Sequence, residues 1–254
     1  MFTHTLSPDI FSIGWFHLRW YSVIYALGFL LTWWFLKYAR KKGAHALSDD
    51  YLSDLITYLI VGVVLGARLF EVFVWEPAYY LSDPVKILYI WQGGLSFHGG
   101  LAGAVIAMAY FCRKKRFSFP KLADLLAIPA AFGLALGRIG NFMNAELVGT
   151  LTDVPWCVKF PRSGGCRHPV QIYGAIGRAF AGIILLHLWK RKHREGFIAL
   201  AFVFLLGIGR LFAEFLRDDP RYLYLSTGQW LSLLMVIVSL TLWFRFYRPA
   251  KKII

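Results

Sequence analysis

Seven apolar stretches, each close to the roughly 20 residues that a membrane-spanning helix needs, constrain this chain more than any other feature. Hydrophobic residues make up 58% of its 254 residues, and short polar or basic segments separate the stretches. We therefore predict an all-α polytopic membrane protein with seven transmembrane helices. Their expected ranges are residues 19–38, 51–75, 94–112, 122–143, 169–189, 197–217 and 229–246.

The segments between the spans are too short for a further domain, so we expect residues 1–254 to form a single integral membrane domain. Residues 1–18 are too short and too mixed in polarity to span. We expect an interfacial N-terminal arm there, with aromatic anchors at Trp15, Phe16 and Trp20. The arm lacks a basic region and a cleavage site of small residues, so the first span is expected to act as its own insertion signal.

Lysine and arginine concentrate at one end of the predicted helices. The chain carries a net charge of +14, but its basic residues form short clusters between apolar spans, so nucleic-acid binding is not expected. Seventeen of the 28 Lys and Arg residues fall on one side of the membrane and seven on the other. The positive-inside rule then places the N-terminus outside and the C-terminus in the cytoplasm. The seventeen belong to four clusters, at residues 37–42, 113–121, 190–194 and 245–252.

The other four basic residues are arginines inside predicted helices, and all four fall in the outer half of the membrane. Charged side chains are costly there and are usually kept for a function. Four guanidiniums against two nearby carboxylates leave excess positive charge, which suits an anion such as the phosphate of a lipid head group. The layer lies roughly 8–14 Å below the outer boundary and contains Arg68, Arg138, Arg178, Arg210, Glu71, Glu214 and His98.

Part of this layer has a structural alternative. Arg68 and Glu71, at positions i and i+3, can form an ion pair within one helix. Arg210 and Glu214, at positions i and i+4, can do the same. Arg138 lies near the end of its span, where an arginine can instead extend its head group to the interface.

His98 stands between glycines in the segment 93–103. Glycines let another backbone or an acyl chain approach closely, and imidazole can accept a proton near neutral pH. The alternative is a glycine stripe for helix packing with a hydrogen-bonded histidine. The sequence contains neither HExxH nor GxSxG, so metalloprotease and serine-protease chemistry is not expected, and we expect no metal and no cofactor.

The segment 137–149, which reads GRIGNFMNAELVG, resembles the signature of the prolipoprotein diacylglyceryl transferase family, the bacterial membrane enzymes of lipoprotein maturation. The resemblance extends over nearly the whole chain. Five accessory motifs recur in order, namely Arg19-Trp20-Tyr21, Gly66-Ala67-Arg68, the segment 93–103, Arg167-His168-Pro169 with Gln171 and Tyr173, and Gly209-Arg210 with Glu214, Phe215 and Arg217.

The resemblance implies a reaction. It is the transfer of the diacylglyceryl group of phosphatidylglycerol to the lipobox cysteine thiol of a prolipoprotein signal peptide, which forms a thioether and releases glycerol phosphate. It also implies a multi-pass protein of the cytoplasmic (inner) membrane with its active site towards the outer leaflet. Positive charge is needed where the leaving phosphate develops.

The resemblance also implies roles for individual residues. The implied catalytic residues are His98 as general base, Tyr21 as its essential neighbour, and Arg138 and Arg210 at the phosphate. The implied phosphatidylglycerol-binding residues are Arg138, Asn141, Glu146, Gly149, Arg210 and Glu214.

Several positions depart from the family pattern, although none of them removes an implied catalytic side chain. Leu206 stands where many members have tyrosine, Gly174 where glutamate is common, and Ala145 where glycine is common. The external head loop predicted at residues 144–168 is also shorter than in many members. It contains Cys157 and Cys166, which could form a disulfide if the outer compartment is oxidising.

Two other classes of function also fit a bundle with buried arginines. A transporter of anionic lipids or organic anions would also gather arginines within its bundle. Alternating access, however, favours a site near the midplane and often paired repeats, and this sequence shows neither. A scaffold for other membrane proteins would tolerate alanine at Arg138 and His98.

Overall fold

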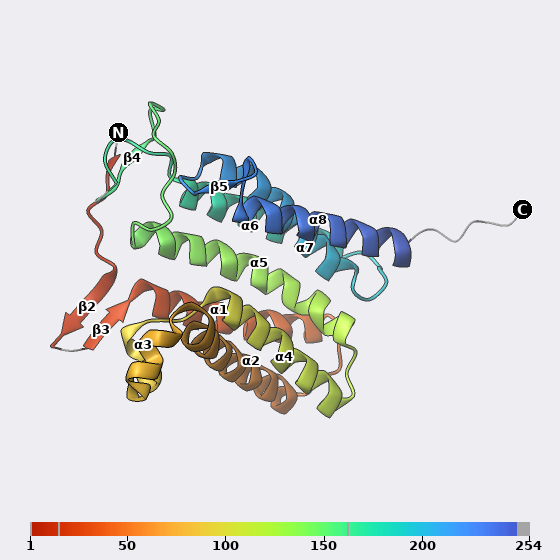
Figure 1. Cartoon of the computed structure of the whole chain (residues 1–254). Helices are drawn as coiled ribbons and strands as arrows, with labels where there is room; N and C mark the ends of the chain where they lie inside the picture. Colours follow the sequence, from red (N-terminus) through yellow and green to blue (C-terminus); the bar gives the residue numbers. More distant parts are fainter. Residues whose placement is uncertain (1, 15, 162, 248–254) are drawn as a thin grey trace, which may run out of the picture. The chain divides into compact units, whose positions relative to one another are not determined.

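The computed structural model describes residues 2–14, 16–161 and 163–247 of the chain, which divides into two compact units. The first unit comprises residues 1–31 and 123–254, and the second comprises residues 32–122. Helices α1 and α5 each continue from one unit into the other. The long helices are α1 Trp20–Lys41, α2 Asp49–Phe70 continued by the π-helix η1 Glu71–Trp75, α4 Phe97–Lys115, α5 Phe119–Met143, α6 Val170–Trp189, α7 Phe197–Ala213 continued by the 3-10 helix η4 Glu214–Leu216, and α8 Thr227–Phe246 (Figure 1).

Within the described ranges, six helices are long and apolar enough to cross a membrane. They are α1, α2 with η1, α5, α6, α7 with η4, and α8, and each lies within three residues of a predicted span. The expectation of an all-α polytopic membrane protein is therefore confirmed. The remaining predicted span, at residues 94–112, corresponds to the helix α4. Its 19 residues include three glycines and three basic residues in the last turn, which lower its hydropathy.

In the second unit, α2 and α4 pack with their backbones in contact. A Cβ atom added at Gly66 would lie 2.9 Å from the Cα of Gly103 and would overlap the carbonyl oxygen of Gly99. Small residues permit this close approach between helices in membranes. Between these helices the chain forms the short helices α3 Pro77–Ser82, η2 Pro84–Leu88 and η3 Ile90–Gln92, which the sequence analysis did not predict.

In the first unit, polar side chains fix the starts of α7 and α8. The Asp124 carboxylate of α5 accepts hydrogen bonds from the backbone N–H groups of Gly196 (2.7 Å) and Ala199 (2.8 Å) at the start of α7. Ser226 and Gln229 form a capping box at the start of α8. These caps satisfy donors that a helix leaves unpaired at its N-terminus.

The N-terminal arm contains short strands rather than a span. Strands β2 Asp9–Ile13 and β3 Phe16–Arg19 form an antiparallel hairpin that leads directly into α1. Strand β1 Phe2–Thr3 pairs in parallel with β4 Val158–Lys159 of the head loop. A third pair, β5 Arg221–Tyr222 with β6 Leu225–Ser226, lies between η4 and α8. The location of the arm at a membrane interface stays a prediction.

A disulfide between Cys157 and Cys166 closes the head loop. Buried His4 also ties the arm to the end of α5, because its Nε2 lies 2.7 Å from the carbonyl oxygen of Phe142. Some residues used in the sequence analysis fall outside the described part of the chain. They are Trp15 and the side chain of Phe16 as aromatic anchors, and Arg162, Arg248, Lys251 and Lys252 in the count of basic residues.

Candidate functional site

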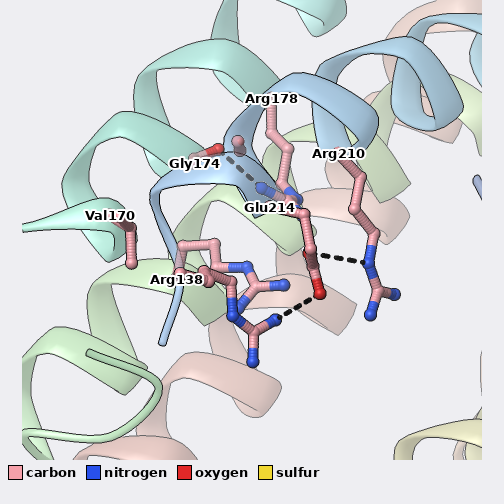
Figure 2. Close-up of a pocket in the computed structure, with 8 residues that line it drawn as sticks. Arg138, Val170, Gly174, Arg178, Arg210 and Glu214 are labelled. Atoms are coloured by element: carbon pink, nitrogen blue, oxygen red, sulfur yellow. Dashed lines mark hydrogen bonds and ion pairs between the residues drawn. The ribbon is translucent and has the colours of Figure 1, made fainter. Parts of the chain in front are cut away.

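Four arginine side chains meet in one pocket of the first unit. Arg138 comes from α5, Arg178 from α6, Arg210 from α7, and Arg217 from the residue after η4. Figure 2 shows the guanidinium groups of Arg138, Arg178 and Arg210 around the Glu214 carboxylate, and Arg217 lines the same pocket. The pocket thus collects cations that lie up to 79 positions apart in the sequence. Its lining is completed by Val170, Gly174 and Ala213.

Glu214 is the one carboxylate among the residues that line this pocket. Its side chain is 2% exposed, and it pairs with Arg210 Nε at 3.5 Å and with an Arg217 terminal nitrogen at 3.3 Å. Arg217 also pairs with Asp219 at 2.9 Å. Two carboxylates against four guanidiniums leave about two unbalanced positive charges. A partly buried excess of this kind is favourable for an anion.

Two arginines of the pocket have only neutral acceptors among the described contacts. Arg138 donates to the Asn141 side-chain oxygen at 3.3 Å, and Arg178 donates to the Gly174 carbonyl oxygen at 2.9 Å. In addition, the Nε–H group of Arg217 is buried without a hydrogen-bond partner in the described structure, and that of Arg210 has only its ion-pair contact with Glu214 at 3.5 Å. The pocket therefore has both charge and hydrogen-bond donors to offer, and guanidinium geometry suits a phosphate.

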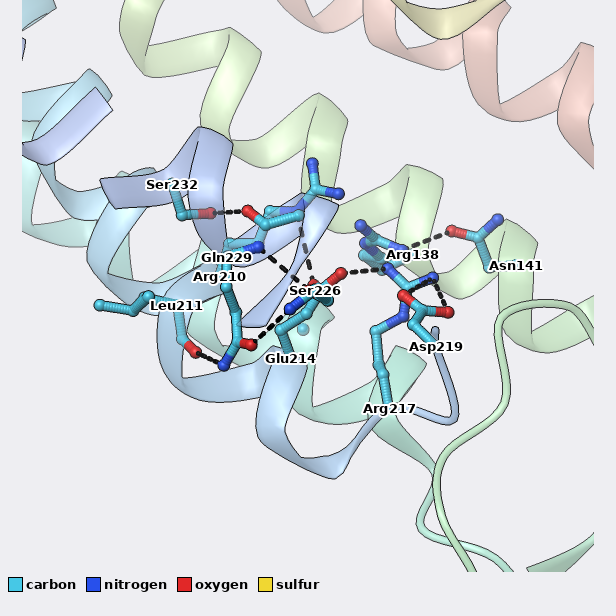
Figure 3. Close-up of polar contacts among 12 residues, drawn as sticks. Arg138, Asn141, Arg210, Leu211, Glu214, Arg217, Asp219, Ser226, Gln229 and Ser232 are labelled. Atoms are coloured by element: carbon cyan, nitrogen blue, oxygen red, sulfur yellow. Dashed lines mark hydrogen bonds and ion pairs between the residues drawn. The ribbon is translucent and has the colours of Figure 1, made fainter. Parts of the chain in front are cut away.

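A second polar cluster adjoins the pocket through Asn141. The hydroxyl of Tyr21, in α1, donates to the Glu146 carboxylate at 3.1 Å, and the Asn141 amide nitrogen donates to the same carboxylate at 3.3 Å. Asn141 also hydrogen-bonds the Tyr21 hydroxyl. The oxygen of the same amide accepts from Arg138, a contact that Figure 3 shows. The Asn141 side chain therefore connects the arginine pocket to this second cluster of Tyr21, Asn141 and Glu146, which we call the carboxylate cluster.

The turn after α5 directs the Glu146 side chain. Ala145 and Leu147 on either side have positive φ angles of 55° and 54°, so the backbone reverses sharply there. The Asn144 amide donates to the second Glu146 carboxylate oxygen at 3.1 Å. Gly149 is needed soon after the turn, because an added Cβ atom would lie 2.5 Å from the carbonyl oxygen of His168.

His98 belongs to the second unit, whereas the arginine pocket belongs to the first. It lies in the first turn of α4, and its exposed ring has Phe97 and Phe70 as aromatic neighbours, at centroid distances of 5.8 and 6.4 Å. No described residue forms a hydrogen bond with its imidazole, whereas Gly99 and Gly103 do pack against the backbone of α2. The glycine stripe of the alternative is therefore present, and the hydrogen-bonded histidine is not found among the described contacts. The approach of His98 to the arginine pocket stays a prediction.

Arg68 does not form the predicted pair with Glu71 among the described contacts. Its guanidinium is buried and instead donates to the carbonyl oxygens of Gly93 and Gly94, both at 2.8 Å. It also donates to the Ile87 carbonyl oxygen at 2.9 Å, and its further acceptors are the Lys86 carbonyl oxygen and the Tyr80 hydroxyl. Arg68 therefore anchors the segment between α2 and α4. By contrast, the predicted pair of Arg210 with Glu214 is present.

The sequence analysis included Arg217, Asn144 and Gln171 in family motifs but assigned none of them a role in the site. Arg217 was counted with the basic residues of the outer loops. Its position three residues after Glu214 was the available signal, because a helical turn brings such residues together. Gln171 donates to the Glu146 carbonyl oxygen at 2.6 Å. The accessory motif singled out Gln171, but a motif does not identify a partner 25 positions away.

Comparison with known proteins places these features in context. The family model described as prolipoprotein diacylglyceryl transferase matches residues 8–245. A Geobacter sulfurreducens protein named phosphatidylglycerol–prolipoprotein diacylglyceryl transferase is 40% identical over 244 residues, which cover 93% of this chain and 94% of the relative. Bordetella parapertussis and Cupriavidus metallidurans proteins of the same name are also 40% identical. They cover 97% and 91% of this chain, and 98% and 90% of their own lengths.

Proposed function

The chain belongs to the prolipoprotein diacylglyceryl transferase family, and we propose that it transfers the diacylglyceryl group of phosphatidylglycerol to a prolipoprotein in the first step of lipoprotein maturation. The observation that carries the mechanism is the arginine pocket. Four guanidiniums from four segments face one lining carboxylate, which suits a phosphate diester bound in the outer half of a membrane. The acceptor is the lipobox cysteine thiol.

The arginine pocket would stabilise the leaving group. In the transfer, the cysteine sulfur attacks the glyceryl carbon that carries the phosphate ester, the S–C bond forms, and the C–O bond breaks with its electron pair on oxygen. Glycerol phosphate then leaves with the additional negative charge. Donors fixed around that phosphate before the reaction lower the barrier, because they need no reorganisation as the charge develops. Arg138 and Arg210 hold the phosphate, and Arg217 and Arg178 add to the local positive charge.

The carboxylate cluster would bind the glycerol end of the head group. A carboxylate can accept hydrogen bonds from two neighbouring hydroxyls, and an amide can both accept a hydrogen bond from a hydroxyl and donate one to it. Asn141 contacts both Arg138 and Glu146, so a phosphate in the pocket and its glycerol hydroxyls at Glu146 would be adjacent. Glu214 orients two of the arginines, and Gly149 lets the backbone of the signature approach the segment at His168.

His98 would accept the thiol proton, which makes the sulfur a thiolate nucleophile. Its side chain is exposed at the start of α4, as contact with a substrate requires. Tyr21 would act as its neighbour in the assembled site, where its hydroxyl already bonds Glu146.

We further propose seven spans in the cytoplasmic membrane, with the N-terminus outside and the site towards the outer leaflet. The support for a seventh span is the packing of α4 along α2, since Gly66, Gly99 and Gly103 bring the two backbones into contact. A helix of 19 residues rises about 28 Å, close to the thickness of the hydrocarbon core. The disulfide in the head loop fits an oxidising outer compartment.

A mass measurement tests the function. Purified protein in detergent is mixed with phosphatidylglycerol and a peptide that contains a lipobox cysteine, and the peptide is then weighed. We expect the peptide to gain one diacylglyceryl group while glycerol phosphate is released. Alkylation of the cysteine beforehand should abolish the gain. If folded protein gives no gain with any glycerophospholipid, the proposed transfer is wrong and lipid transport becomes the function to assay.

A further inference from the structure

Gln171 has a buried side-chain amide that forms a hydrogen bond with the turn at residues 145–147, directly after α5. It is the second residue of α6 and is 1% exposed. Its amide nitrogen donates to the backbone carbonyl oxygen of Glu146 at 2.6 Å. It does not line the arginine pocket, and it contacts no other side chain of the carboxylate cluster in the described structure.

The backbone that Gln171 holds is conformationally unfavourable. Glu146 lies between two non-glycine residues with positive φ, Ala145 and Leu147. The left-handed conformation is unfavourable for residues with a Cβ atom, so the turn needs external support to remain in one geometry. The Glu146 N–H donates to the carbonyl oxygen of Asn141 at 2.9 Å, and Gln171 binds the opposite end of the residue. Both backbone polar groups of Glu146 are thereby fixed.

The other end of the Gln171 amide has no partner. Its oxygen Oε1 is buried without a hydrogen-bond donor in the described structure. An unsatisfied buried polar atom reduces stability, so a leucine of similar size should fold at least as well at this position. The hydrogen bond to Glu146 is therefore better explained by the geometry of the turn than by the stability of the fold.

We propose that Gln171 is a positioning residue that aims the Glu146 carboxylate at the lipid head group. The proposal rests on the function proposed above, in which Glu146 binds the glycerol end of phosphatidylglycerol. When the amide is removed, the turn gains alternative conformations, and the carboxylate loses its fixed position beside Tyr21 and Asn141.

The test compares Gln171→Leu with the unchanged protein in three measurements. They are the dissociation constant for fluorescent phosphatidylglycerol, the rate of transfer, and the melting temperature. Transfer by the unchanged protein establishes the underlying function first, so a failure of the function is seen separately. We expect the dissociation constant to rise on the order of tenfold, the effect of losing about 1.4 kcal/mol, while the melting temperature is equal or higher.

Two further variants separate positioning from a structural role. Gln229→Leu removes a buried amide that forms the capping box of α8, and its melting temperature should fall.

Glu146→Gln alone and combined with Gln171→Leu gives a double-mutant cycle. If Gln171 acts through Glu146, the double variant binds lipid no more weakly than Glu146→Gln. An unchanged dissociation constant in Gln171→Leu, or additive losses in the double variant, would overturn the proposal.

Discussion

Arg138 and Arg68 show how the surroundings of a residue decide the role of a membrane-embedded arginine. Arg138 makes one hydrogen bond, to the Asn141 side chain, and faces a pocket with other cations. Arg68 is buried and saturated by carbonyl oxygens and a tyrosine hydroxyl. The two share their residue type, and their predicted depths are similar, so a sequence cannot separate them without the contacts.

Because of this difference, we expect lysine at position 138 to lower activity and lysine at position 68 to lower stability. Arg138→Lys keeps the charge but loses the planar fork, so we expect transfer to fall about 10- to 100-fold, since a hydrogen bond to a charged group contributes roughly 1.5–3 kcal/mol. Its melting temperature should not change. Arg68→Lys cannot reach the same carbonyl oxygens and should melt at a lower temperature. Initial rates from the peptide mass assay and thermal unfolding in detergent check both, and equal destabilisation by the two changes would contradict the assignment.

Ala145 has a φ angle of 55°, in the left-handed region that favours glycine. A Cβ atom is unfavourable in this conformation, whereas glycine adopts it readily. Ala145→Gly should therefore raise the free energy of unfolding by about 1 kcal/mol. Urea or thermal unfolding measures this difference. The matched change Ala135→Gly, in the regular part of α5, should lower stability, and a stabilising effect there would remove the support for this reasoning.

His45, in the loop between α1 and α2, provides a test by pH. Its Nδ1 accepts from the Leu47 N–H at 3.2 Å, and its Nε2 donates to the Leu36 carbonyl oxygen at 2.9 Å, so the neutral form fits both contacts. Burial lowers the pKa of the His45 imidazole from its usual 6.5. The unfolded chain therefore takes up the proton first, and the stabilisation present above about pH 6.5 is lost as the pH falls through the lowered pKa.

The comparison of unfolding between pH 7.5 and pH 5 measures this effect. The unchanged protein should lose more stability over that interval than His45→Gln, which has no titratable group at this position. An identical pH dependence of the two proteins would show that His45 does not contribute.

At the scale of the elements, hydropathy predicted the six most apolar helices within three residues of their ends. It did so because a span is defined by local composition. The short helices between α2 and α4 and the three strand pairs were not predicted. Their positions depend on distant partners, such as the carbonyl oxygens that Arg68 binds and the pairing of β1 with β4. The same limit explains why Arg138 and Glu214 were predicted as site residues and Gln171 was not.

The contact of α2 with α4 gives a prediction for whole elements. A Cβ atom at Gly103 would overlap the carbonyl oxygen of Gly62, and rigid backbone cannot move away as a side chain can. Gly103→Ala should therefore separate the two helices and lower the melting temperature by several degrees, as overpacking typically costs about 1–3 kcal/mol. Gly133→Ala in α5 is the matched control, since its added Cβ atom meets no atom within 4 Å. Equal melting temperatures of the two variants would exclude a tight α2–α4 contact.

At the scale of the whole molecule, α4 decides on which side of the membrane the arginine pocket opens. If α4 crosses and the N-terminus is outside, the segment between α4 and α5 is cytoplasmic and the segment between α7 and α8 is external. If α4 does not cross, both assignments reverse, because every later helix starts from the opposite side. With the N-terminus outside, the sidedness of these two segments therefore decides whether α4 crosses the membrane.

Cysteine labelling of cells measures that sidedness. Ser118→Cys lies between α4 and α5, and Tyr224→Cys replaces a residue that is 93% exposed between β5 and β6. With seven spans, a membrane-impermeant thiol reagent should label Tyr224→Cys in intact cells and Ser118→Cys only after permeabilisation. The buried Cys112 and the bonded Cys157 and Cys166 should give little background. The reverse pattern would place the arginine pocket on the cytoplasmic side, where a secreted precursor could not present its cysteine after crossing the membrane, and the proposed orientation would be wrong.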